Sequence, residues 1–70
     1  MATTKRANCR FTAKEVDGER SYLALELLRG DDLQLPGSVT FEFRTGTSLE
    51  EAEEIALFLN DHIRSVAVTR

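Results

Sequence analysis

The sequence predicts an α+β fold, a two-layer sandwich in which a three-stranded antiparallel meander packs on one helix. Two alternating stretches flank Asp17-Gly18, a third covers residues 39–44, and an apolar stripe at helical spacing follows Ser48. Residues 1–8 show no periodicity and are expected to form a flexible N-terminal tail. Residues 9–70 are expected to form a single domain, because 70 residues support one core at most.

The first two strands are expected to form a hairpin with a three-residue or bulged turn. Their apolar residues alternate with polar ones: Cys9, Phe11 and Ala13 before the turn, and Leu23, Leu25 and Leu27 after it. A two-residue turn at Asp17-Gly18 would divide these side chains between two faces, which is unfavourable when one face is buried. A turn of Asp17-Gly18-Glu19 restores agreement and pairs the strands as Cys9–Leu27, Phe11–Leu25, Arg10–Glu26 and Lys14–Tyr22.

A loop and a third strand follow the hairpin. Residues 29–38 contain two glycines, the only proline and two adjacent aspartates, which predicts a loop. Residues 39–44 alternate again and predict a strand that Gly46 ends. The expected core face combines the apolar residues of all three strands: Cys9, Phe11, Leu23, Leu25, Leu27, Val39, Phe41 and Phe43.

A helix is predicted from Leu49 to about Ile63. Ser48 with Glu51 is a capping box, and Thr47 with Glu50 is an alternative reading of the same signal. Glutamates crowd the first turns, where the helix dipole favours anions. The stripe expected to face the sheet consists of Leu49, Ala52, Ile55, Ala56, Leu59 and Ile63.

The last segment, residues 65–69, is short and β-branched. The sequence leaves open whether this segment forms a fourth, edge strand. If it does, the helix becomes a crossover between strands. A right-handed crossover would lay the fourth strand parallel to the first strand, at the edge of the sheet.

Charge, hydropathy and cysteine content argue against several classes of function. Nine basic and twelve acidic residues give a net charge of −3, whereas a nucleic-acid binder usually has a basic surplus, so no nucleic-acid binding is expected. No apolar run approaches the ~20 residues needed to span a bilayer. The chain has one cysteine and no secretory signal at its start, so a cytoplasmic location and no internal disulfide are expected.

No constellation typical of catalysis, metal binding or cofactor binding is present. Nucleophile elbows, calcium-loop spacing and glycine-rich phosphate loops are all lacking, so the protein is expected to be non-enzymatic and to need no metal or cofactor. His62 is expected to be a structural residue near the helix end, and Cys9 a small core residue. A catalytic or metal-binding role for His62 and a reactive thiol at Cys9 remain the alternatives.

The function indicated best is a protein-interaction module that self-associates or binds another protein. Leu57 and Phe58 fall outside the buried stripe and are ringed by carboxylates. With a three-residue turn, Tyr22 and Leu28 are the apolar points of the sheet face away from the helix. The candidate interaction surface therefore comprises Leu57, Phe58, Glu50, Glu54, Asp61, Tyr22 and Leu28.

The alternative function is a nucleic-acid-associated accessory protein that uses its basic N-terminal half. Residues 1–29 carry a net charge of +2, whereas residues 30–70 carry −5. The basic residues that would serve this function are Lys5, Arg6, Arg10, Lys14 and Arg20.

Overall fold

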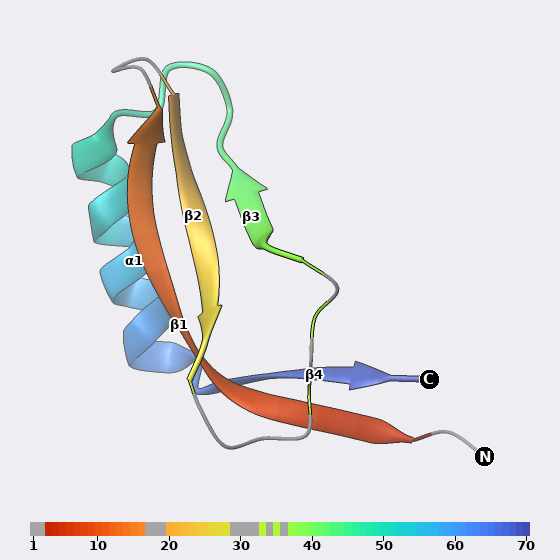
Figure 1. The fold of residues 1–70 in the computed structure, drawn as a ribbon. Coiled ribbons are helices and arrows are strands. Elements are labelled where there is room, and N and C mark those ends of the chain that lie inside the picture. Colours follow the sequence, from red (N-terminus) through yellow and green to blue (C-terminus); the bar gives the residue numbers. More distant parts are fainter. Residues whose placement is uncertain (1–2, 17–19, 29–32, 34, 36) are drawn as a thin grey trace.

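The computed structural model describes residues 3–16, 20–28, 33, 35 and 37–70. These residues form the strands β1 (Thr4–Val16), β2 (Arg20–Leu27), β3 (Val39–Glu42) and β4 (Ser65–Thr69) and the helix α1 (Leu49–His62). The strands make one antiparallel sheet in the order β3-β2-β1-β4, and α1 packs against it (Figure 1). The predicted α+β fold is confirmed, and the fourth strand forms.

The register of β1 and β2 is the one that a three-residue turn requires. The pairs include Cys9–Leu27, Phe11–Leu25, Arg10–Glu26, Lys14–Tyr22 and Val16–Arg20. The turn itself, at residues 17–19, lies outside the described residues. This register places the alternating apolar side chains of both strands on the same side of the sheet, where α1 packs.

β1 begins at Thr4, so residues 4–8 belong to the sheet and the expected N-terminal tail is wrong for them. This first part of β1 pairs with β4, whereas the later part pairs with β2. Residues 4–8 have no alternating pattern, and their partner strand lies at the other end of the chain. Long-range pairing rather than local sequence therefore forms this part of the strand.

β4 lies beside β1 at the edge of the sheet, as expected, but the predicted parallel direction is wrong. The two strands are antiparallel. A parallel strand would require the chain to reverse after α1. Instead, the C-cap residue Ile63 is already extended (φ −114°, ψ 121°), and only Arg64 separates it from β4. The chain therefore continues away from the end of the helix (Figure 1).

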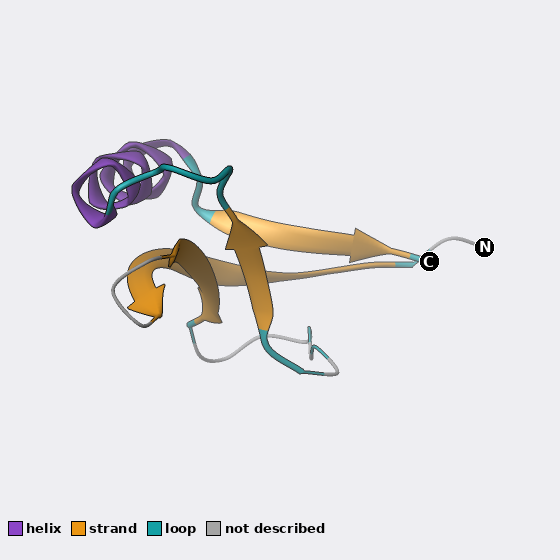
Figure 2. Cartoon of the chain, turned by 90° about the horizontal axis from the view of Figure 1, so that it is seen from above, coloured by secondary structure: helices purple, strands orange, loops and turns teal. Residues whose placement is uncertain are grey.

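The paired ends of the chain form a two-stranded arm that extends away from the helix (Figures 1 and 2). We define the arm as residues 3–8 and 64–70. Beyond the β1–β4 ladder, Thr3 and Arg70 exchange two backbone hydrogen bonds of 2.8 and 2.9 Å. The molecule measures 43 × 24 × 20 Å and has a radius of gyration of 13.6 Å. A compact chain of this length would have a radius of about 11 Å, so the arm makes the molecule elongated.

The core lies between α1 and the hairpin of β1 and β2. Its buried cluster consists of Cys9, Phe11, Leu23 and Ala56. No Cα atom of α1 lies within 8 Å of β3. Consequently Phe41 on β3 is 48% exposed, although its ring contacts that of Phe11 at a centroid distance of 6.0 Å. Ile55 on α1 is 39% exposed.

The prediction that Phe41 and Ile55 are core residues is therefore wrong. One helix is about 10 Å wide, and neighbouring strands are about 4.8 Å apart, so a single helix covers roughly two strands. Here α1 covers β1 and β2 and leaves the helix-side face of β3 open.

The start of α1 matches the first of the two predicted capping boxes. The Ser48 hydroxyl accepts a hydrogen bond from the Glu51 backbone N–H at 3.1 Å, and the Glu51 carboxylate accepts one from the Ser48 backbone N–H at 3.4 Å. Gly46, at φ +96°, provides the left-handed turn that leads into the cap. The helix ends at His62, one residue before the predicted end.

Asn60 attaches α1 to the edge of β1. Its side-chain oxygen accepts a hydrogen bond from the Phe11 backbone N–H at 2.8 Å, and its amide nitrogen donates one to the Phe11 carbonyl at 2.9 Å. An amide side chain offers one acceptor and one donor group, as a residue of a neighbouring strand does. Asn60 therefore occupies the place of a strand partner for Phe11.

The direction of the β1 backbone groups shows which edge this is. The Asn8 carbonyl accepts a hydrogen bond from the Leu28 N–H, so even-numbered residues of β1 face β2. The backbone groups of odd-numbered residues face the opposite edge. Along this edge, residues 4–8 pair with β4, and the next residue, Cys9, donates its N–H to the Arg64 carbonyl at 2.9 Å. Phe11 is the next odd residue, and Asn60 binds it.

Replacing Asn60 with alanine is expected to lower the free energy of unfolding by about 1–3 kcal/mol, because the Phe11 N–H and C=O lose their partners at a partly buried site. Alanine has the higher helix propensity, so the intrinsic effect on α1 acts in the opposite direction. Urea unfolding followed by circular dichroism measures the difference.

The matched control is Glu53→Ala, at an exposed position of the same helix. This control is expected to change the free energy of unfolding by less than about 0.5 kcal/mol. Equal unfolding free energies for the two variants would contradict the role of Asn60.

Candidate functional site

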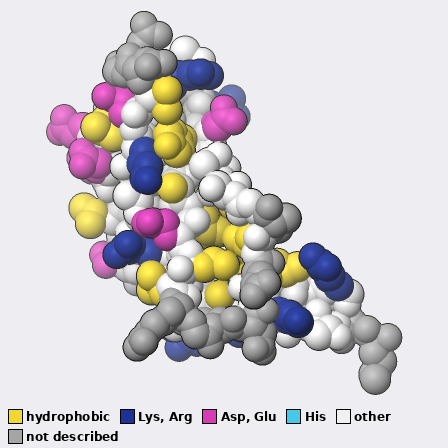
Figure 3. All heavy atoms as spheres, viewed as in Figure 1, with side chains coloured by type: hydrophobic (Ala, Val, Ile, Leu, Met, Phe, Trp, Pro, Cys, Tyr) yellow, Lys and Arg dark blue, Asp and Glu magenta, His cyan; other side chains and the backbone are white. Residues whose placement is uncertain are grey.

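The most exposed large apolar side chains of the described residues lie on α1. Leu57 is 66% exposed and Phe58 is 61% exposed. The Phe58 ring stacks on His62 at a centroid distance of 4.2 Å and an angle of 21°. Figure 3 shows acidic side chains along the side of the molecule that α1 forms. We define the helix patch as the exposed residues Glu50, Glu54, Leu57, Phe58 and Asp61.

Tyr22 and Leu28 do not join the helix patch. Tyr22 lies opposite Lys14 on one side and Glu42 on the other, on the sheet face away from α1. Leu28 follows the end of β2 and is 43% exposed. The structure therefore divides the residues proposed from the sequence between two separate surfaces.

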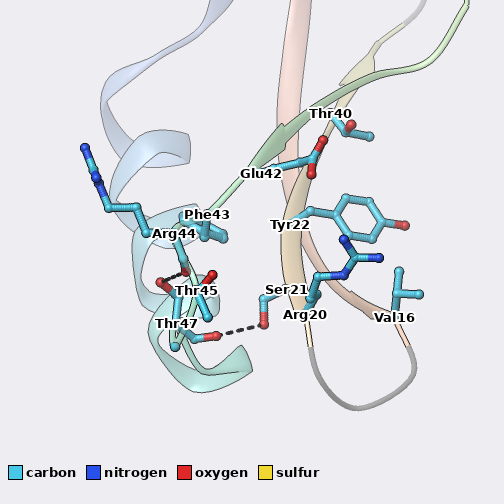
Figure 4. A pocket seen from close by; sticks show the side chains of 11 residues that line it. Val16, Arg20, Ser21, Tyr22, Thr40, Glu42, Phe43, Arg44, Thr45 and Thr47 are labelled. Carbon is cyan, nitrogen blue, oxygen red and sulfur yellow. Dashed lines mark hydrogen bonds between the residues drawn. The ribbon is translucent and has the colours of Figure 1, made fainter.

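A pocket of about 320 Å³ lies beside Tyr22, between the ends of β2 and β3 and the loop before α1. Figure 4 shows the Arg20 guanidinium beside the Tyr22 ring, the Glu42 carboxylate on the other side of the ring, and Arg44 directed away from it. The Ser21 hydroxyl donates to the Thr47 carbonyl at 3.5 Å across the base of this pocket. The pocket thus has the Tyr22 ring between opposite charges and Phe43 as a second aromatic residue, and no histidine or cysteine is among its described lining residues.

A second recess of about 310 Å³ lies at the C-terminal end of α1, and its lining includes both Cys9 and His62. Burial raises the pKa of the Cys9 thiol, which keeps it protonated and weakly nucleophilic. His62 Nδ1 lies 2.8 Å from the Phe58 carbonyl oxygen, and because a carbonyl only accepts, Nδ1 is the donor. No hydrogen bond joins Cys9 to His62 within the described residues.

Glu26 is the centre of a polar cluster on the open sheet face. The Thr12 hydroxyl donates a hydrogen bond to Glu26 Oε1, and Arg10 Nη2 lies 3.4 Å from the same oxygen. The hydrogen bond from Thr12 and, after it, the positive charge of Arg10 hold the pKa of Glu26 below its ordinary value. This cluster fixes a cross-strand pair rather than forming a site with free ligands.

The arm gathers cations that the sequence separates. Its exposed basic residues are Lys5, Arg6, Arg64 and Arg70, and it contains no aspartate or glutamate. Counting charge by halves of the sequence missed this group, because β4 comes from the acidic half and pairs with the start of β1. The remaining basic residues considered for nucleic-acid binding, Arg10, Lys14 and Arg20, lie on the open sheet face instead.

No protein-family model, no curated protein and no solved structure matches this chain. In the described ranges, no helix has both the length and the apolar character to cross a bilayer. Among these same residues, no three histidine, cysteine, aspartate or glutamate side chains gather as metal ligands would.

Thr12→Val is expected to raise the pKa of Glu26, because the Thr12 hydroxyl is the main cause of its depression. A depressed pKa in the folded state stabilises the fold above the unfolded-state pKa, and this stabilisation is lost as the pH falls through the folded-state pKa. Thr12→Val therefore loses part of the folding free energy that the Glu26 carboxylate contributes above its unfolded-state pKa. Titration of the Glu26 carboxyl by NMR measures the shift.

Thr40→Val is the matched control, because this exposed hydroxyl on β3 has no hydrogen bond to Glu26 among the described residues. It is expected to leave the Glu26 pKa unchanged. A Glu26 pKa that is the same in Thr12→Val and in the unmodified protein would refute the assigned cause.

Proposed function

We propose that this protein is a non-enzymatic protein-interaction module that self-associates through the helix patch. The observation that supports it is the exposure of Leu57 and Phe58, adjacent residues that point away from the sheet. The core does not need them, because Ala52, Ala56 and Leu59 already fill the side of α1 that faces the sheet.

Burial of these two side chains offers a large part of the energy for association. Complete burial of a leucine or phenylalanine side chain contributes about 1.5–3 kcal/mol. The stacking of Phe58 on His62 orders its ring before contact, which reduces the entropy lost on binding. The surrounding carboxylates favour a basic counterpart and disfavour other acidic surfaces.

The small size of the chain gives association a second benefit. A domain of 70 residues buries only about 60% of its unfolded surface, so its own core is marginal. The proposal places the protein in the reducing cytoplasm, where the single cysteine remains a thiol.

A second candidate function, association with nucleic acid, is supported by the arm. Four cations on a two-stranded ribbon without carboxylates could contact phosphates. The net charge of −3 and the acidic helix oppose it, because both repel a polyanion. Sub-micromolar binding of duplex DNA or RNA in ~0.15 M salt would favour this candidate over the first.

The double variant Leu57→Ser with Phe58→Ser is expected to abolish self-association and to leave the melting temperature nearly unchanged, because both side chains are exposed in the single chain. Sedimentation or light scattering measures the mass, and circular dichroism measures melting. Tyr22→Glu is the matched control, since it alters the other candidate surface and is expected to leave association intact.

Three results would speak against the proposal. The unmodified protein could be monomeric, or the double variant could associate as strongly as the unmodified protein. A collapsed melt in a strictly monomeric protein would instead show that Phe58 belongs to the core.

A further inference from the structure

The molecule separates its charges between two of its parts. The arm has four basic residues and no acidic one, whereas α1 has five carboxylates and neither lysine nor arginine. The arm and α1 together have a net charge of −1. Because the whole chain has a net charge of −3, all other residues together have a net charge of −2. The arm and the helix are therefore the basic and the acidic poles of this protein.

These poles do not neutralise each other within one chain. The arm leaves the C-terminal end of α1 and extends away from it (Figures 1 and 2). Among the described residues, the only ion pair joins Arg10 to Glu26, so no cation of the arm pairs with a carboxylate of the helix. Both sets of charges remain free for contact with another molecule.

The arm and the helix patch also carry charges of opposite sign at comparable spacings. β4 is an uncharged strand between two arginines, Arg64 and Arg70, which lie about 20 Å apart along an extended chain. The helix patch has its apolar pair between acidic residues, and Glu50 and Asp61 lie about 16 Å apart along the helix axis. The helix patch thus has acidic residues at both ends of its apolar pair, and the arm has arginines at both ends of β4, with Lys5 and Arg6 of β1 opposite Val68 and Ala67.

We infer that the helix patch of one copy binds the basic arm of a second copy. This inference rests on the proposed self-association and names its partner surface. A two-fold axis lets each arm lie on the helix of the other copy, so two identical contacts form and the assembly closes as a dimer. Attraction between the poles guides the approach, and contact between the Leu57–Phe58 pair and the apolar side chains of β4 holds the complex.

Two charge-reversed variants test this pairing. The arm variant is Arg64→Glu with Arg70→Glu, and the helix variant is Glu54→Lys with Asp61→Lys. All four side chains are exposed, and the β1–β4 ladder uses backbone groups, so the fold is expected to persist in thermal melting. Each variant alone is expected to raise the dimer dissociation constant at least tenfold, measured by sedimentation equilibrium.

Mixing the two variants gives the decisive measurement. In the mixed dimer, the reversed charges at positions 64 and 70 of one copy meet the reversed charges at positions 54 and 61 of the other, and the unmodified arm meets the unmodified helix. A heterodimer is therefore expected with a dissociation constant within threefold of the unmodified protein. The matched control, Lys14→Glu with Arg20→Glu, makes the same charge change on the open sheet face and is expected to preserve the homodimer.

The outcomes separate this inference from the function on which it rests. If the arm variant dimerises like the unmodified protein while Leu57→Ser with Phe58→Ser does not, the helix patch is the contact but the arm is not its partner. If the mixture yields no heterodimer, the inference is likewise overturned. A monomeric unmodified protein would overturn both proposals, and arm-dependent binding of a DNA duplex by that monomer would assign the arm to nucleic acid.

Discussion

The pair of hydrogen bonds between the Asn60 amide and the Phe11 backbone determines how the chain is arranged around β1. These bonds place α1 at the edge of the strand, where a fourth strand would otherwise continue. β4 therefore pairs only with residues 4–8. β1 therefore has different partners on this edge along its length: β4 beside residues 4–8, and Asn60 at Phe11.

The exposed surfaces follow from this position of the helix. Because α1 is held toward β1, it leaves β3 uncovered, and Phe41 remains half exposed. The side of α1 opposite the sheet carries Leu57 and Phe58, and no described element covers them. The arm extends away from the acidic helix, although its first arginine, Arg64, lines the same recess as Asp61 at the end of α1. The separation of charges that supports the inferred dimer is thus a consequence of the topology, not of composition alone.

Local patterns in the sequence predicted the elements whose signals are local. The period of two and the Asp17-Gly18 dipeptide were enough to derive the register of β1 and β2, and Ser48 with Glu51 gave the helix start. The direction of β4 could not be derived, because it depends on how the chain leaves α1 at Ile63. Asn60 gave no signal, since an asparagine in a helix is usually solvated. Of the candidate site residues, Leu57 and Phe58 are exposed on α1 as helical spacing predicts, whereas Tyr22 and Leu28 lie on another surface.

Amide hydrogen exchange along β1 tests whether Asn60 binds the free edge of this strand. The backbone amides of the even-numbered β1 residues face β2, which protects them from exchange. The amides of the odd-numbered residues therefore report on the other edge of β1. The amides of Cys9 and Phe11 are expected to exchange slowly, because Arg64 and Asn60 accept their protons, whereas Ala13 has no described partner on that edge and is expected to exchange faster. Exchange at Phe11 as fast as at Ala13 would show that Asn60 does not bind this edge and does not position α1 beside β1.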